Sequence, residues 1–168
     1  MEISIIVACT KNGAIGRNNE LLYHLKEDLK NFKKLTTDNV VIMGRKTVES
    51  LPRYPLNGRI CLCLSKQDKF LNYGGAFNTL ENALEYCSEH HNDKEIFIAG
   101  GGQIYKEVLE KDLADNLYMT IIDEIVEDAD TFFPLLERNK WMLINSKSIE
   151  DNKFIGLKYN INWFVRNR

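Results

Sequence analysis

The sequence predicts an α/β fold: a single domain over residues 1–168, with a central, mostly parallel and twisted sheet, a C-terminal antiparallel hairpin and about four flanking helices. In the first two-thirds of the chain, short apolar segments typical of strands buried on both faces alternate with amphipathic helical segments. In the last third, apolar and polar residues alternate one by one, which indicates antiparallel strands. A chain of 168 residues that is 44% hydrophobic suits one domain with its own core.

The individual elements follow from these patterns. Buried strands are predicted at residues 3–9, 40–43, 60–64 and 96–99, because each is a short apolar run. Helices are expected at residues 25–36, from about residue 47, around 80–87 and through 104–109. After residue 116 the chain turns to strands, with one at 117–123 and a long one at 157–165. Residues 141–149 are the expected antiparallel mate of the last strand, joined to it through a polar turn at 150–153.

Composition argues against several classes of function. Lys and Arg number 22 and Asp and Glu 24, so the net charge of -2 gives no general attraction to nucleic acid or to a membrane. The apolar stretch at residues 3–9 is too short for a signal peptide and lacks its basic flank, so we expect a cytoplasmic protein. A monomer is expected as well, although no sequence pattern decides the oligomeric state. Neither histidines nor cysteines have metal-binding spacings, so no metal site is predicted, and free core thiols are favoured over zinc ligands or disulfides.

The most informative single residue is a carboxylate on an apolar helical face. Leu25, Asp28, Phe32 and Leu35 are spaced three and four apart, so Asp28 shares a face with three core-type side chains. A buried charge needs a partner, and Thr120, a hydroxyl set in an apolar strand, could supply a hydrogen bond. The less specific alternatives are that Asp28 stays at the rim of the first helical turn and that Thr120 reflects ordinary strand propensity.

Two glycine turns point to a ligand rich in negative charge. Residues 96–105 read as an apolar strand, three glycines (Gly100, Gly101, Gly102) and a helix start, an arrangement that lets backbone approach a phosphate. The spacing does not fit the G-x-G-x-x-G dinucleotide motif. Residues 40–47 repeat the order of strand, glycine and helix start, but Asn39 replaces the first glycine that a P-loop requires.

A local excess of basic residues accompanies these turns. Between residues 45 and 66 there are five basic residues and one acidic residue, a net of +4 in an otherwise acidic chain. Each turn alone could be no more than a tight strand-to-helix connection. Both turns together with this charge bias favour a site for a phosphate-rich cofactor or a polycarboxylate.

Taken together, these motifs resemble the dihydrofolate reductase family. The resemblance runs through nearly the whole chain and keeps the family's order and spacing. Its segments are IVA at 6–8, NGAIG at 12–16, Asp28 with FK at 32–33, VIMGRKT at 41–47, ESL at 49–51, GR at 58–59, IAGGGQIY at 98–105, TIID at 120–123 and DTFFP at 130–134.

The resemblance implies NADPH-dependent reduction of 7,8-dihydrofolate to tetrahydrofolate, with a hydride passing to C6 of the pterin and a proton to N5. By this resemblance the Asp28 carboxylate accepts hydrogen bonds from the pterin's N3 and 2-amino groups, and Thr120 supports it directly or through water. Asp28 would then be the acid that favours protonation at N5, through its electrostatic field and an ordered water. Apolar surroundings should raise the pKa of Asp28 above its usual value of about 3.9. Tyr23 stands where the family commonly has a tryptophan that anchors an ordered water, and is grouped with these catalytic residues.

The resemblance also assigns the remaining site residues. Residues 12–22 would form a mobile lid. Antifolate inhibitors are expected ligands. The implied substrate-binding residues are Ile6, Ala8, Leu29, Phe32, Leu51, Arg59, Ala99 and Tyr105. The implied cofactor-binding residues are Ala8, Ile15, Gly16, Gly44, Arg45, Lys46, Thr47, Leu64, Ser65, Lys66, Gly100, Gly101, Gly102, Gln103, Ile104 and Tyr105.

Two other functions compete with this interpretation. The related reductase of riboflavin synthesis shares the fold and NADPH but acts on a ribitylated or phosphoribosylated pyrimidine; Asp28 and Arg59 favour a folate instead. A non-catalytic nucleotide-binding protein is disfavoured because an abandoned site has no physical need for a carboxylate on an apolar face. The chain departs from the family at Leu22 and Tyr23, where Pro-Trp is usual, and at Val48, Ala99 and Ala129.

Overall fold

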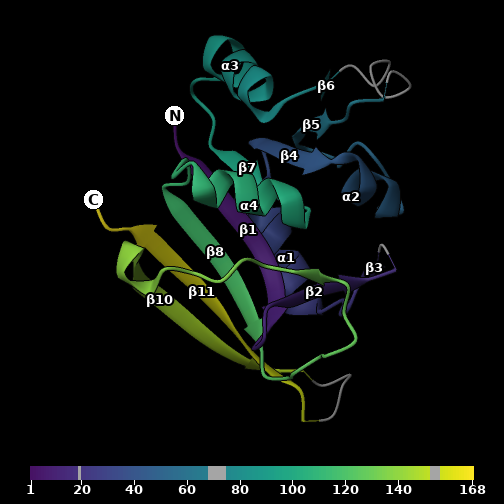
Figure 1. Ribbon diagram of the computed structural model, residues 1–168, viewed down its shortest axis with the longest axis vertical. Helices are drawn as coiled ribbons and strands as arrows, with labels where there is room; N and C mark the ends of the chain where they lie inside the picture. The colour runs from purple at the N-terminus through teal and green to yellow at the C-terminus, as the bar shows by residue number, and fades with distance from the viewer. Residues whose placement is uncertain (19, 68–74, 152–155) are drawn as a thin grey trace.

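An eight-stranded mixed sheet forms the centre of the computed structural model, which describes all residues except 19, 68–74 and 152–155. The strand order is β10-β11-β8-β1-β7-β4-β5-β6 (Figure 1). The strands from β8 to β6 run parallel, whereas β11 pairs antiparallel with β8 and with β10. The predicted fold class is therefore confirmed. The strand bounds are β1 Ile3–Thr10, β4 Val40–Gly44, β5 Ile60–Leu64, β6 Ala76–Phe77, β7 Ile96–Ile98, β8 Asn116–Ile122, β10 Trp141–Glu150 and β11 Lys158–Arg166.

Four α-helices flank the sheet on its two faces. They are α1 Lys26–Thr36, α2 Arg45–Ser50, α3 Leu80–His90 and α4 Gly102–Glu110, with a short 3-10 helix, η2, at Arg138–Lys140. Figure 1 shows α4 in front of the sheet and α1 behind it. Helix α2 begins at Arg45 rather than near residue 47, because Gly44 is the last extended residue and the helix follows it directly.

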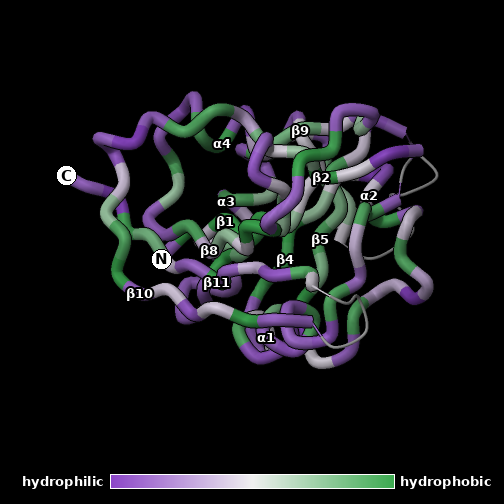
Figure 2. The backbone as a smooth tube through the Cα atoms, turned by 90° about the horizontal axis from the view of Figure 1, so that it is seen from below, coloured by the Kyte–Doolittle hydropathy of each residue, from purple (hydrophilic) through white to green (hydrophobic). Residues whose placement is uncertain are grey.

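Alternate residues of β1 supply two separate cores. Ile5 and Val7 pack with α3 and α4 on one face of the sheet, and Ile6 packs with α1 and α2 on the other. A strand covered on both faces must be apolar throughout, which explains the continuous hydrophobic run at the start of the chain. In Figure 2 the green of hydrophobic residues is concentrated in the central strands, and α1 and α4 lie on opposite sides of them.

A second, three-stranded sheet was not predicted. Its order is β3-β2-β9, with bounds Glu20–Leu21, Ala14–Arg17 and Thr131–Phe132. These strands, like β6, are too short to show an alternating pattern. The predicted turn at residues 150–153 is only partly visible, since residues 152 and 153 lie outside the described residues.

The cysteines of the described structure are free, and three of them, Cys9, Cys63 and Cys87, are buried. Within the described residues, no cluster of three or more His, Cys, Asp or Glu side chains is arranged to hold a metal ion. Across the same ranges, no helix has both the length and the hydropathy of a membrane span.

Candidate active site

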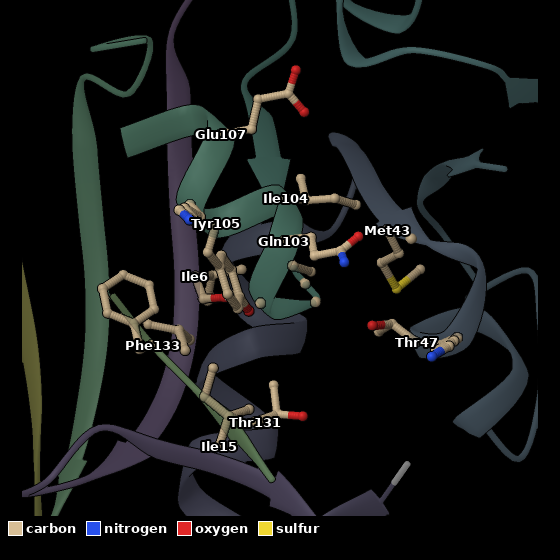
Figure 3. Close-up of a pocket in the computed structure, with 18 of the residues that line it drawn as sticks. Ile6, Ile15, Met43, Thr47, Gln103, Ile104, Tyr105, Glu107, Thr131 and Phe133 are labelled. Carbon is tan, nitrogen blue, oxygen red and sulfur yellow. The ribbon is translucent and has the colours of Figure 1, made fainter. Parts of the chain in front are cut away.

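A long groove runs along the carboxyl ends of the parallel strands, between residues 15–17 and 20–21 of β2 and β3 and helices α1, α2 and α4. Figure 3 shows Thr47 projecting from α2 towards the α4 side, while Ile15 and Thr131 lie at another end of the same space. In open α/β sheets this edge is where ligands bind. The groove is lined by every substrate- and cofactor-binding residue that the sequence resemblance assigned, from Ile6 and Ala8 to Ile104 and Tyr105.

The acid of the groove is held by a buried hydroxyl. Asp28 lies in the first turn of α1, is partly buried and lines the groove. Thr120 of β8 is buried behind it and donates its hydroxyl to Asp28 Oδ1 over 2.5 Å. Burial raises the pKa of Asp28 above its usual value, and the hydrogen bond from Thr120 partly opposes this rise. The result is a carboxyl group inside the groove that takes up a proton more readily than an exposed one.

A buried tyrosine joins helix α4 to strand β1 beside the groove. Tyr105 of α4 is buried and donates its hydroxyl to the backbone carbonyl of Ile6 in β1, over 2.9 Å. In Figure 3 its ring descends from α4 to the side of Ile6. Burial raises the pKa of the Tyr105 phenol well above its usual range, so the group stays neutral and acts as a fixed wall.

The glycine turn brings backbone close to the groove. Gly100 has a φ of +126°, which L side chains rarely adopt, and a Cβ there would lie 3.3 Å from Thr47 Oγ1 and 3.4 Å from Tyr105 Oη. Gly101 is the N-cap of α4, and no side chain of the described residues caps the start of this helix. The first N–H groups of α4 are therefore available to an anion, and the helix dipole favours one there.

Basic side chains line the groove on the other side of this turn. Arg45 at the start of α2, Lys46 and Lys66 face the same space as Gly101. Arg45 Nη1 is bound by both carboxylate oxygens of Glu49, at 2.9 and 3.1 Å. This end of the groove suits a phosphate, although Glu49 partly neutralises its arginine.

The opposite end of the groove is apolar and closes on one arginine. Leu29, Phe32, Leu51 and Leu56 form its walls, and Arg59 lies at its end. Four of the lining residues are large hydrophobic side chains with much of their surface in water: Leu21 is 48%, Leu29 46%, Phe132 43% and Leu135 99% exposed. Such surface suits a flat, largely apolar ligand with a terminal acid.

The loop 12–18, part of the predicted lid, is tied to residues 124–133. Asn12 Nδ2 donates to the Val126 carbonyl over 2.9 Å, and the Asn18 N–H donates to Asp130 Oδ2 over 2.8 Å. The hydrogen bond from the Asn18 N–H, with smaller contributions from Thr131 and Arg17, holds the pKa of Asp130 below its usual value. Residue 19 of the predicted lid lies outside the described residues.

Two residues grouped with the catalytic set do not line the groove. Thr120 lies behind Asp28, as described above. Tyr23 packs beside Leu25, Ile122 and Tyr159 in a separate apolar cluster, and burial together with the charge of Glu124 raises its pKa. The structure therefore brings Thr120 to the acid but does not bring Tyr23 into the groove lining.

Sequence reasoning missed several lining residues. Val7 and Met43 are buried and read from sequence as ordinary core, while Thr131 and Phe132 belong to the two-residue strand β9. The only signal for Thr131 and Phe132 was the resemblance of residues 130–134 to the family pattern. An α/β sheet with a groove that offers an anion-binding turn, a basic side and a partly buried acid fits the class of enzymes that use a phosphate-rich cofactor, dinucleotide-dependent oxidoreductases among them.

Comparison with known proteins narrows this class. The sequence profile of dihydrofolate reductase matches residues 2–166, and the chain belongs to the dihydrofolate reductase family. It is 40% identical to the dihydrofolate reductase of Neisseria meningitidis and 41% identical to that of Haemophilus influenzae, covering 84% of each protein and 84% of this chain. A bifunctional dihydrofolate reductase-thymidylate synthase of Paramecium tetraurelia is 40% identical over 71% of this chain, but the match spans a quarter of that longer protein.

A solved structure agrees with the fold. Dihydrofolate reductase from Enterococcus faecalis, complexed with NADP(H) and RAB-propyl, superposes with a TM-score of 0.87 at 29% identity, over 99% of this chain and 97% of that one.

The glycine turn gives a testable contrast. We expect Gly100→Ala to lower the free energy of unfolding by about 1–3 kcal/mol and to weaken cofactor binding, because the added Cβ meets Thr47 and Tyr105. Gly156→Ala is the matched control, since Gly156 also has a positive φ of +81° but a Cβ there would meet nothing within 4 Å among the described residues. Denaturant unfolding and NADPH titration of both variants check this; equal loss of NADPH affinity in the two would contradict it.

Proposed function

We propose that this chain catalyses the NADPH-dependent reduction of 7,8-dihydrofolate to 5,6,7,8-tetrahydrofolate, with Asp28 as its proton-delivering acid. The observation that carries the proposal is the Asp28–Thr120 pair, set in one groove with the glycine turn and the basic side chains. Family membership supports the reaction, and the placement of these residues supports the assignment of roles.

The cofactor fits one side of the groove. Gly101, Gly102 and Gln103 would hold the pyrophosphate at the uncapped start of α4, and Arg45, Ser65 and Lys66 would surround the 2′-phosphate of the adenosine. The bound nicotinamide supplies the hydride. We assign the other cofactor contacts to the remaining lining residues named above, among them Ile15, Gly16, Gly44, Lys46, Thr47, Leu64, Gly100 and Ile104.

The substrate fits the apolar side. Asp28 would accept hydrogen bonds from the pterin's N3 and 2-amino groups, and Phe32 and Leu51 would wall the pterin and benzoyl rings. Arg59 would bind the α-carboxylate of the glutamate with two parallel N–H···O bonds. Asp28 meets the ring on the side away from N5, so its field and an ordered water favour protonation there. Thr120 fixes the orientation of the carboxyl group.

A spectrophotometric assay tests the reaction. With dihydrofolate present, we expect the absorbance of NADPH to fall quickly and that of NADH to fall much more slowly, because the basic side chains near Arg45 select the 2′-phosphate. Turnover of a ribitylated pyrimidine with none of dihydrofolate would assign the chain to the riboflavin-type reaction instead. Tight NADPH binding without hydride transfer to either substrate would indicate a non-catalytic protein. A cytoplasmic location and a monomeric state are further parts of the proposal.

The role of Asp28 is tested by Asp28→Asn. The amide cannot supply or hold a proton as the acid does, so turnover near neutral pH should fall by about 100-fold or more, while NADPH binding is retained. In the wild type, hydride transfer should slow as the pH rises through the raised pKa of Asp28, and this step in the profile should be absent from the variant. Near-normal turnover in Asp28→Asn would remove Asp28 from proton delivery.

The same variant has a second readout, the stability of the free protein. The pKa of Asp28 is higher in the folded than in the unfolded chain, so its contribution to stability is present at low pH and is lost as the pH rises through the folded pKa. Asp28→Asn should therefore be more stable than the wild type near neutral pH, and the difference should shrink on acidification. Denaturant melts at several pH values measure this.

The role of Arg45 is tested through its partner Glu49. Because Glu49 repels the 2′-phosphate that Arg45 would bind, Glu49→Gln should tighten NADPH binding severalfold and leave NADH binding unchanged. The control is Glu27→Gln, since Glu27 forms its ion pair with Lys30 on α1 and does not line the groove. Weaker NADPH binding in Glu49→Gln would show that the pair orients Arg45 instead of neutralising it.

A further inference from the structure

We propose that Thr36 is a positioning residue for substrate recognition: its buried hydroxyl fixes the guanidinium of Arg59 at the end of the groove. Thr36 does not line the groove and is the last residue of α1. The inference rests on the proposed function, in which Arg59 receives the glutamate carboxylate of dihydrofolate.

The two hydrogen-bond partners of the Thr36 hydroxyl decide which bond it donates and which it accepts. Its side chain is fully buried, so no water reaches the hydroxyl. Thr36 Oγ1 lies 2.7 Å from the Phe32 carbonyl, which can only accept, so the hydroxyl proton is donated there. The oxygen is left with its lone pairs, and one of these accepts a hydrogen bond from Arg59 Nη1 at 3.3 Å. The rotation of the hydroxyl is therefore fixed, and Thr36 acts on Arg59 solely as an acceptor.

The backbone around Arg59 is already held in place. The Asp38 N–H donates to the Gly58 carbonyl over 2.8 Å, and the Ile60 N–H donates to the Asn39 carbonyl over 3.0 Å. These bonds join the segment after α1 to the segment that carries Arg59. What remains free to move is the long arginine side chain, which carries several rotatable bonds and a large conformational entropy.

Thr36 is the one side chain that accepts a hydrogen bond from the Arg59 guanidinium in the described part of the chain. Arg59 Nε is buried and has no hydrogen-bond partner there, and because this atom is enclosed a ligand in the groove would meet the Nη atoms instead. The hydrogen bond to Thr36 engages Nη1 and leaves the outer edge of the guanidinium, formed by the two Nη atoms, for a carboxylate. The partial negative charge at the end of α1 also favours a cation in this place. A guanidinium ordered before binding loses less entropy when the substrate arrives.

The same three residues connect the two parts of the substrate site. Phe32, whose ring would wall the pterin and benzoyl rings, is one turn before Thr36 on α1 and contributes the carbonyl that sets its hydroxyl. Arg59 follows in space through the bond from Nη1. The guanidinium of Arg59 is thus linked by a hydrogen bond to the helix that also carries Asp28.

The experiment compares Thr36→Val with Thr36→Ser on two substrates. Valine keeps the shape of threonine but removes the acceptor, whereas serine retains it. The substrates are dihydrofolate and dihydropteroate, which has the same rings but no glutamate. For Thr36→Val we expect the KM for dihydrofolate to rise about tenfold with kcat nearly unchanged, and the KM for dihydropteroate to stay the same. Thr36→Ser should behave like the wild type.

A purely structural role for Thr36 gives a different result. Loosening of the end of α1 would alter the kinetics of both substrates together, and an equal rise in KM for the two would overturn the proposal. An unchanged KM for dihydrofolate in Thr36→Val would also overturn it. If Thr36→Val does not fold, Thr36→Ala removes the same acceptor and is read in the same way. Adding Thr36→Val to Arg59→Gln should raise the KM for dihydrofolate no further, and an additional tenfold rise would contradict an action through Arg59.

Failure of this inference can be told apart from failure of the proposed function. If the wild type turns over neither dihydrofolate nor dihydropteroate, the proposed function is wrong and the assignment of Thr36 falls with it. If the wild type turns over both and Thr36→Val changes nothing, only the assignment of Thr36 is wrong.

Discussion

The site depends on one partly buried carboxyl group, Asp28, that is held by a neutral hydroxyl and, within the described residues, by no cation. Asp28 could have been neutralised by an arginine or lysine, which would have lowered its pKa and removed its use as an acid. Its hydrogen-bond partner in the described structure is instead the neutral hydroxyl of Thr120, which orients the group but opposes the effect of burial only in part. The cost of burying this group falls on the stability of the protein, and in the proposed mechanism the same burial keeps the group available as an acid.

The rest of the fold can be understood as support for this arrangement. Thr120 belongs to β8, which pairs with β1 so that Thr120 lies opposite Ala8. Tyr105 ties α4 to β1 at Ile6, two residues earlier on the same strand. Strand β1 therefore contacts the three parts of the site: the helix that carries Asp28, the strand that carries Thr120, and the helix that follows the glycine turn. Because β1 is covered on both faces, it cannot shift without disturbing both cores.

Much of this arrangement could be predicted from sequence, and the successes share a physical cause. Strands covered on both faces and helices with one apolar stripe leave strong patterns, so β1, β4, β5, β7 and α1 were found nearly at their true bounds. Asp28 was found because it breaks such a pattern. The short strands of the second sheet escaped because two to four residues carry no measurable period, and the place of Tyr23 depends on tertiary packing that no local pattern encodes. The Thr36–Arg59 hydrogen bond was missed for a related reason, since it joins a threonine that looks like an ordinary helix end to a residue 23 positions away.

The half-exposed side chains of Leu21, Leu29 and Phe132 have a consequence for the life of the protein in a cell. In the free chain these side chains expose hydrophobic surface to solvent, and a bound dinucleotide or pterin would cover this surface. Ligands that bind only the folded form raise its melting temperature by mass action, with a negative change in heat capacity as this surface is covered. The lifetime of the folded chain is thus coupled to the supply of the metabolites it handles.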